Sequence, residues 1–599
     1  MGYFIRSFLT ERKARVYIDG KLSSPHTIAN GVPQGSVLAP TLFLIGMQSL
    51  FDVVPEDVNV LAYADDITLI SVSPYSVLSR KQLQIAVNRV DNWAPSMGFI
   101  FAPEKSKLMH LSSRKKKLNK LPPLIMGNKV IPIVHSSRIL GVLVDDKLKF
   151  INHANQVRKS ASLKLNILKK LCSARGAGSR SSLFRFLHGW LMPAMLHGLG
   201  LFSRGGDRIN EKLEPLYNQA VRIIGGAFRS SPIVSIMAES GQIPFDYVIA
   251  RNLSSKTIRW LSYNRNPEVP MVQRTESYLQ KYETSIPEIS TRPEPRLRKF
   301  NAPVPKVDLS LLSAVRAGGS STVALANYLQ LVSRKYQSIP KFFTDGSKST
   351  DGQVGCGIFS TTDSVALSLP PKCSVFSSEA FAILKAAQDL CPSTGAVIFS
   401  DSASVLRAVQ AANTKHPWII ALSNIAATKK ITLCWIPGHS GIPGNEAADR
   451  LALNGSQLEP PNTAIPPSDA SHWLKNHLLL SWANTWNNIT ENKLREIKNC
   501  TYAWSDRNSF FERRALTRIR IGHTRLTHGY LMGKEDPPIC PACSVVITIK
   551  HILTQCPIHQ QARLDCDLAD NLRQILSNDP EEEEKVLSFL RSSSIYEEI

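Results

Sequence analysis

Acidic residues, cysteines and long apolar runs are all scarce in this sequence of 599 residues. Ten cysteines are too few and too unevenly spaced for a disulfide scaffold, which indicates a reducing compartment. The best candidate for a membrane span, residues 182–202, is interrupted by Arg185, His188, Pro193 and His197. The amino terminus lacks the apolar segment of a signal peptide. We therefore expect a soluble protein of the cytoplasm or nucleus.

The shortage of acidic residues leaves a strongly basic chain. It has 71 Lys and Arg against 48 Asp and Glu, a formal net charge of +23 at pH 7. Basic side chains that displace phosphate counterions gain affinity for nucleic acid whatever its base sequence. Nucleic acid is therefore the leading expected partner, and an acidic membrane surface is the second. The run at 105–120, with seven Lys or Arg and no acid, is either a nucleic-acid contact or a solvated face.

Two proline-rich stretches, 264–310 and 457–468, divide the chain, because neither can continue a helix or a central strand. The segment between them reads as a strand, a turn at Asp351-Gly352 and a second strand, followed by alternating helices and strands. This order predicts a mixed sheet with helices packed on it. Residues 150–260 and 470–530 have helical patterns. The expected fold class is therefore multidomain, α/β and α+β.

Four acids stand at informative places in the middle segment. Asp345 is expected at the end of a first strand, Glu379 in the first turn of a helix, Asp401 at the end of a buried strand, and Asp449 on the last helix. Carboxylates that meet at one sheet edge repel one another unless divalent cations lie between them, and oxygen ligands select Mg²⁺ or Mn²⁺. A pair of such ions can hydrolyse a phosphodiester. Taken singly, each acid is more simply a cap or a solvated turn residue.

Four segments of the same region carry a resemblance to a known family. "FTDGS", "SSEAFAI", "FSDSASV" and "WIPGHSGIPGNEAADRLA" resemble type 1 RNase H in order and separation over residues 338–455. The resemblance implies that the four acids bind two Mg²⁺ or Mn²⁺ ions and that the enzyme cuts the RNA strand of an RNA–DNA hybrid. It also implies that His439 assists proton transfer or product release, whereas the alternative is a structural loop histidine. Asn445 and the backbone around Gly346 and Ser347 would contact substrate.

The stretch "LAYADDITLI" at 61–70 sets Asp65 and Asp66 inside an apolar run. With "NGVPQGSVLAPTLFLI" upstream and Lys105 downstream, it resembles the palm of a reverse transcriptase, here of the non-LTR retrotransposon kind, which is jockey-like. The resemblance implies that Asp65 and Asp66 belong to a polymerase metal site. It also implies that Gln34, Gly35 and Lys105 contact nucleic acid, an RNA template with a DNA primer.

A complete palm also has a metal-binding Asp on a strand well before "VPQGS". The only acids in the first 30 residues are Glu11 and Asp19, and neither lies in an apolar strand of that kind. We therefore expect a partial palm without fingers, whose polymerase activity is doubtful. The alternative is that the sequence is a fragment of a full-length active reverse transcriptase.

The carboxy-terminal region contains a second set of potential metal ligands. Cys540, Cys543, His551 and Cys556 form C-x2-C-x7-H-x4-C, which is close to a zinc knuckle but has a longer central gap. Three sulfurs and one imidazole suit tetrahedral Zn²⁺. The alternative is a set of unpaired cysteines in a helical tail.

The sequence thus predicts an RNA–DNA hybrid ribonuclease within a retrotransposon-derived protein. A non-catalytic nucleic-acid-binding remnant is the competing hypothesis. The expected domains are a partial palm at 1–150, a helical thumb and connection at 151–263, a proline-rich linker with a connecting helix at 264–337, an RNase H domain at 338–456 and a helical Cys/His tail at 469–599.

Overall fold

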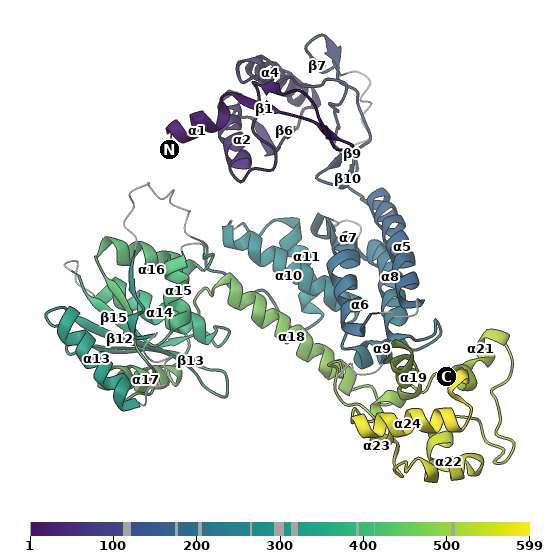
Figure 1. Cartoon of the computed structure of the whole chain (residues 1–599). Coiled ribbons are helices and arrows are strands. Elements are labelled where there is room, and N and C mark those ends of the chain that lie inside the picture. Colours follow the sequence, from purple (N-terminus) through teal and green to yellow (C-terminus); the bar gives the residue numbers. More distant parts are fainter. Residues whose placement is uncertain are drawn as a thin grey trace. The chain divides into compact units, whose positions relative to one another are not determined.

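The computed structural model divides into two compact units, Met1–His153 and Ala154–Ile599 (Figure 1). In the described residues, no helix has the length and apolarity that crossing a membrane would require. Residues 112–120 of the predicted basic run lie outside the described residues. The described residues are 2–111, 121–173, 178–201, 206–263, 266–292, 305–312, 321–390, 395–411, 414–504 and 509–599.

The first unit is built around one long helix and a hairpin. α4 buries Val90 and Trp93 against Leu50 and Val58, and the pair β5–β6 packs on the same cluster. The elements are α1 (Gly2–Leu9), β1 (Arg12–Ala14), β2 (Tyr17–Ile18), β3 (Lys21–Leu22), β4 (His26–Ile28), α2 (Ala39–Met47), α3 (Leu50–Val53), β5 (Val58–Tyr63), β6 (Asp66–Ser71), α4 (Ser76–Ser96), β7 (Ile125–Met126), β8 (Lys129–Val130), β9 (Ser136–Ile139) and β10 (Val142–Asp145).

The second unit begins with helices, as the sequence pattern between 150 and 260 predicts. Figure 1 shows α18, drawn in green, running beside α10, and Tyr247 of α10 packs on Trp482 of α18 with ring centroids 6.0 Å apart. Seven of these helices precede the strands of this unit's sheet in the sequence, and α18 follows them. They are α5 (Ile151–Ser173), α6 (Arg180–Phe186), α7 (Met192–Leu196), α8 (Gly206–Gly225), α9 (Ile233–Ser240), α10 (Phe245–Tyr263), α11 (Pro270–Gln280) and α18 (Pro467–Asn487).

The sheet domain has six strands in the order β11-β16-β15-β12-β13-β14. β11, β16, β15 and β12 are parallel neighbours, whereas β12, β13 and β14 pair antiparallel, so the sheet is mixed as predicted. Its elements are β11 (Lys306–Asp308), α13 (Ser321–Lys335), β12 (Lys341–Lys348), β13 (Val354–Phe359), β14 (Ser364–Leu369), α14 (Val375–Lys385), β15 (Val397–Ser400), α15 (Ala403–Ala411), α16 (Pro417–Thr428), β16 (Thr432–Trp435) and α17 (Pro443–Ser456).

Helices α14 and α17 cover opposite faces of β13. Side chains alternate along a strand, so Cys356 points away from the face of Gly355 and Gly357. The Cys356 thiol lies 3.3 Å from the Ser378 carbonyl of α14, whereas a Cβ at Gly355 or Gly357 would overlap the backbone of α17. The two glycines therefore let α17 lie directly on the sheet.

The carboxy-terminal region has its own core, and a buried ion network ties it to α9. Lys498 and Arg520 both face Glu239 of α9, with N···O distances of 3.7 and 3.5 Å, and Arg520 also pairs with Glu583 at 2.8 Å. All four side chains are at most 5% exposed. The helices here are α19 (Phe510–Arg520), α20 (Arg525–His528), α21 (Tyr530–Gly533), α22 (Gln560–Asp565), α23 (Leu572–Ile575) and α24 (Pro580–Ser592).

Candidate nuclease site and metal centres

Three of the predicted carboxylates converge at one place in the sheet domain. Carboxylate oxygens of Asp345, Glu379 and Asp401 lie within 4.8 Å of one another. Asp345 comes from β12, Glu379 from α14, and Asp401 directly follows β15. Asp449 of α17 shares a hydrogen bond with Asp345, which joins the fourth acid to the group.

Two positions differ in detail from the prediction. Asp345 lies within β12, three residues before its last residue, because the strand continues through its pairing with β13. Glu379 is the fifth residue of α14 and not in its first turn, because the N-cap is Ser374, whose hydroxyl accepts the amide of Ser377. The helix therefore starts earlier than the "SSEAFAI" segment suggests.

The backbone brings α14 against β12 at Gly346. A Cβ at this position would meet the Glu379 amide nitrogen at 2.5 Å, so only glycine lets the helix approach the strand this closely. The observed role of Gly346 is therefore packing beneath Glu379. Ser347, its neighbour in β12, is half-buried.

Burial, followed by mutual repulsion, raises the pKa values of Asp345, Glu379 and Asp401. Burial, with the charge of Asp401 second, raises the pKa of Asp345 to about 7. Burial and the neighbouring charges of Asp345 and Asp401 raise the pKa of Glu379 to about 9. Burial also raises the pKa of Asp401, against the hydrogen bond from Asn445. Ionisation of these acids is therefore unfavourable when no cation is bound between them.

A cation fits this donor set. The Glu379 Oε2 atom is buried without a hydrogen-bond partner, as an oxygen reserved for a ligand would be. All the facing donors are carboxylate oxygens, which hard divalent cations prefer. Asp345, Glu379 and Asp401 are therefore the residues that could hold Mg²⁺ or Mn²⁺, with Asp449 beside them.

Asn445 and His439 approach Asp401 from the segment after β16. Asn445 is 4% exposed, and its amide donates to the Asp401 carboxylate at 3.4 Å. Its described contact is therefore with a site carboxylate, whereas the sequence predicted contact with substrate. His439 is exposed in a turn with a φ of 49°, and its positive charge when protonated acts to lower the pKa of Asp401.

The predicted polymerase residues lie in the first unit, apart from any described metal cluster. Asp65 is exposed in the turn between β5 and β6, and Asp66 is exposed as the first residue of β6, which explains how two acids fit inside an apolar run. Within the described ranges, two groups of three or more potential ligands occur, and neither includes these acids. Gln34, Gly35 and Lys105 lie in turns of the same unit.

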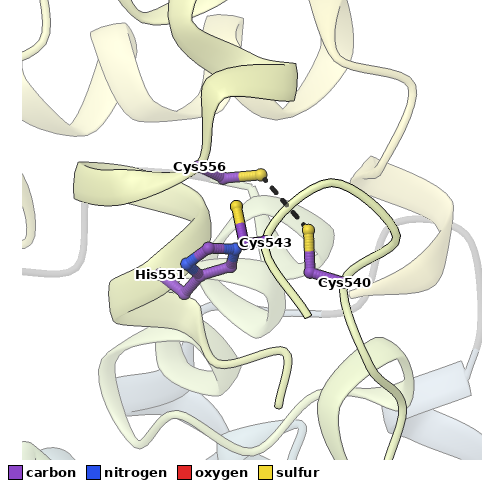
Figure 2. Close-up of side chains that lie close together, drawn as sticks. All are labelled: Cys540, Cys543, His551 and Cys556. Atoms are coloured by element: carbon purple, nitrogen blue, oxygen red, sulfur yellow. Dashed lines mark hydrogen bonds between the residues drawn. The ribbon is translucent and has the colours of Figure 1, made fainter. Parts of the chain in front are cut away.

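The four predicted zinc ligands also converge. Ligand atoms of Cys540, Cys543, His551 and Cys556 lie within 4.8 Å of one another, and Figure 2 shows the four side chains pointing together. The Cys540 and Cys556 sulfurs are 3.7 Å apart, and His551 Nε2 is buried without a hydrogen-bond partner. The hydrogen bond from the His551 side chain lowers the pKa of the Cys540 thiol to about 6, which favours the thiolate, whereas burial raises the pKa of the Cys543 thiol to about 11.

Two family models match the chain in the places that these sites occupy. Residues 1–157 match the reverse transcriptase (RNA-dependent DNA polymerase) model, and residues 338–457 match the RNase H model.

Three of the curated relatives are proteins of Drosophila melanogaster mobile elements. The RNA-directed DNA polymerase from mobile element jockey is 27% identical over 229 residues, which are 37% of this chain and 25% of that protein. The probable RNA-directed DNA polymerase from transposon X-element is 25% identical over 37% of this chain and 24% of its own length. A putative 115 kDa protein in type-1 retrotransposable element R1DM is 24% identical over 40% of this chain and 23% of its own length. The matched part thus spans about a quarter of each relative.

These matches relate the chain to non-LTR retrotransposon polyproteins. In this chain the core of the sheet domain extends beyond the segment that the sequence motifs delimit. β11 pairs with β16, and Tyr328 and Tyr336, from α13 and the residue after it, pack edge-on against Phe399 of β15. A strand of three residues among prolines carries no readable period, which is why sequence reasoning assigned residues 264–337 to a linker and a connecting helix.

Proposed function

We propose that the sheet domain of this chain hydrolyses the RNA strand of RNA–DNA hybrids. The observation that carries the proposal is the mutual approach of Asp345, Glu379 and Asp401 within 4.8 Å, in a domain that matches RNase H. When bound there, Mg²⁺ or Mn²⁺ would supply positive charge against the developing charge of the phosphodiester. The proposal concerns hydrolysis and makes no use of Asp65 and Asp66.

The chain's own residues divide the remaining work. Asp345, Glu379, Asp401 and Asp449 hold the cations, and their partial burial limits the water that competes for them. Asn445 positions Asp401 through its amide. His439, exposed beside Asp401, is the group proposed to carry a proton to or from the cleaved ester. The 2′-hydroxyl is the group by which a protein distinguishes RNA from DNA.

The proposal is tested with the purified chain and a hybrid labelled on its RNA strand. We expect cleavage in Mg²⁺ and none in chelator. Glu379→Gln should lower the rate at least about a hundredfold, the scale of losing one preorganised electrostatic group. Glu446→Gln, an exposed acid of α17, is the matched control and should cut normally. A Glu379→Gln rate equal to that of the parent would contradict the proposal.

A second proposal concerns the Cys/His cluster. We propose that Cys540, Cys543, His551 and Cys556 bind one Zn²⁺ that stabilises the carboxy-terminal core. The proximity of the four ligands and the unpartnered Nε2 of His551 support it. Metal analysis after purification without chelator should give about one zinc per chain, because three thiolates and an imidazole complete a tetrahedron. The ratio should fall in Cys543→Ser, and an equal ratio in that variant would exclude the site.

A further inference from the structure

A cavity of about 1100 Å³ lies within the second unit, and its lining includes residues of β12 and α14, the elements that carry Asp345 and Glu379. Its walls come from α10, the segment before α14 and the first turns of α18. Two of these elements are outside the residues that the RNase H model matches. The cavity is therefore not a feature of the nuclease domain alone.

The lining is strongly basic. It includes five Lys or Arg side chains, namely Arg259, Arg292, Lys348, Lys372 and Lys415. Of the described residues that line the cavity, Asp469 is the one acid, and it is 5% exposed. Its carboxylate accepts the amide and the hydroxyl of Ser374 at 3.1 and 2.9 Å. With that acid held by Ser374, the cavity presents net positive charge to an occupant.

Hydrogen bonds hold the walls in place. The Ser374–Asp469 contacts fasten the start of α14 to α18. The strip leading to Arg292 is held to the segment before α18, because the Ser290 amide donates to the Ile465 carbonyl at 2.8 Å. His477 Nε2 of α18 lies 3.0 Å from the carbonyl of Tyr282. These contacts show that the cavity is preformed and is not a gap between independent parts. The cavity is called the basic groove below.

An aromatic surface faces the same space. The Lys372 ammonium lies 4.4 Å from the ring centroid of Trp473, and both side chains line the cavity. Cations combined with an aromatic ring, here the half-buried Trp473, are the combination that nucleic-acid grooves use, because the cations neutralise phosphates and the ring contacts sugar or base. A purely acidic peptide would pair with the cations but would have no group that stacks on the ring.

The groove begins close to the carboxylates. Val375 and Phe376 line it, and Glu379 lies about one helical turn further along α14, about 6 Å. On β12, Lys348 is three residues beyond Asp345, about 10 Å. At a rise of about 3.4 Å per nucleotide, these lengths correspond to roughly two to three nucleotides.

We propose that this groove binds the sugar–phosphate backbone of the hybrid a few nucleotides from the cleaved bond. The assignment rests on the proposed nuclease function for its substrate. It adds α10 and α18, which are outside the nuclease domain, as part of the substrate grip. Arg259 and Lys415, both exposed at the groove, are the cations most open to a phosphate.

The test measures binding separately from cleavage. The full chain with Asp401→Asn is titrated with a fluorescein-labelled hybrid two helical turns long, over a range of salt. Adding Arg259→Gln and Lys415→Gln should weaken binding roughly ten- to hundredfold at physiological salt, because each charge-assisted contact contributes about a factor of ten. The slope of log affinity against log salt should fall by about 2.

Two matched variants control for net charge and for folding. Arg334→Gln with Lys306→Gln removes the same two charges from exposed positions outside the groove and should leave affinity near that of the parent. Arg259→Lys with Lys415→Arg keeps the groove's charge and should retain binding. Equal affinity in the groove and control pairs would overturn the proposal.

Cleavage by the chain with an intact Asp401 separates the two proposals. Groove-dependent binding without any RNA cleavage would leave the groove standing and refute the nuclease function. Normal cleavage, together with an affinity that Arg259→Gln and Lys415→Gln leave unchanged, would refute the groove proposal and leave the nuclease proposal intact.

Discussion

Replacing Glu379 with Gln should stabilise the metal-free protein at neutral and alkaline pH. Burial, together with the neighbouring carboxylates of Asp345 and Asp401, raises the pKa of Glu379 to about 9 from an ordinary value of 4.5. Between those pH values the folded chain holds a proton that the unfolded chain has lost. Stability therefore falls as pH rises from about 4.5 to about 9. Gln cannot ionise, so the variant lacks this loss.

The magnitude follows from the size of the pKa change. One pH unit corresponds to about 1.4 kcal/mol, so at pH 7.5 the parent loses on the order of 3–4 kcal/mol relative to pH 4.5. Asp345 adds to the loss in the same direction up to its pKa of about 7. Clustering the carboxylates thus lowers the free energy of unfolding of the metal-free protein, and a bound cation would offset that loss.

Amide hydrogen exchange in β12 and β15 reports on the sheet domain within the full chain. In chelator at pH 7.5, Glu379→Gln should exchange more slowly there than the parent, and the difference should vanish near pH 4.5. Added Mg²⁺ should reverse the order, because the parent gains binding energy that the variant has lost. The control Glu446→Gln should follow the parent throughout. Faster exchange in Glu379→Gln at pH 7.5 without metal would refute the reasoning.

Two further predictions concern packing. Glu239→Ala should lower the free energy of unfolding by about 3–5 kcal/mol, because it leaves the buried cations Lys498 and Arg520 without their shared carboxylate. Urea unfolding measures this change, and a decrease under about 1 kcal/mol would contradict the role of the network. A nuclease fragment of residues 305–457 should unfold at a higher temperature than one of 338–457, because β11 and α13 belong to its core; equal melting temperatures would show that these elements are dispensable.

The sequence predicted chemistry better than it predicted boundaries. The residues that converge in the two clusters could be named in advance, because carboxylates, thiols and an imidazole stand at motif positions, whereas their roles as metal ligands stay a prediction. The start of α14 was misplaced because Ser374, Ser377 and Ser378 are all acceptable caps, and the structure uses Ser374, which also bonds to Asp469 of α18. The basic groove could not be predicted, because Arg259 and Trp473 are more than 200 residues apart and meet only after folding.

The most direct test of the nuclease account is strand-specific cleavage of one hybrid labelled on both strands. With Mg²⁺, the parent chain should cut the RNA strand and leave the DNA strand intact. Asp401→Asn should cut neither strand while keeping the parent's circular dichroism spectrum, because it removes one of the three converging carboxylates. Cleavage of the DNA strand at a similar rate, or RNA cleavage by Asp401→Asn at the parent's rate, would contradict the account.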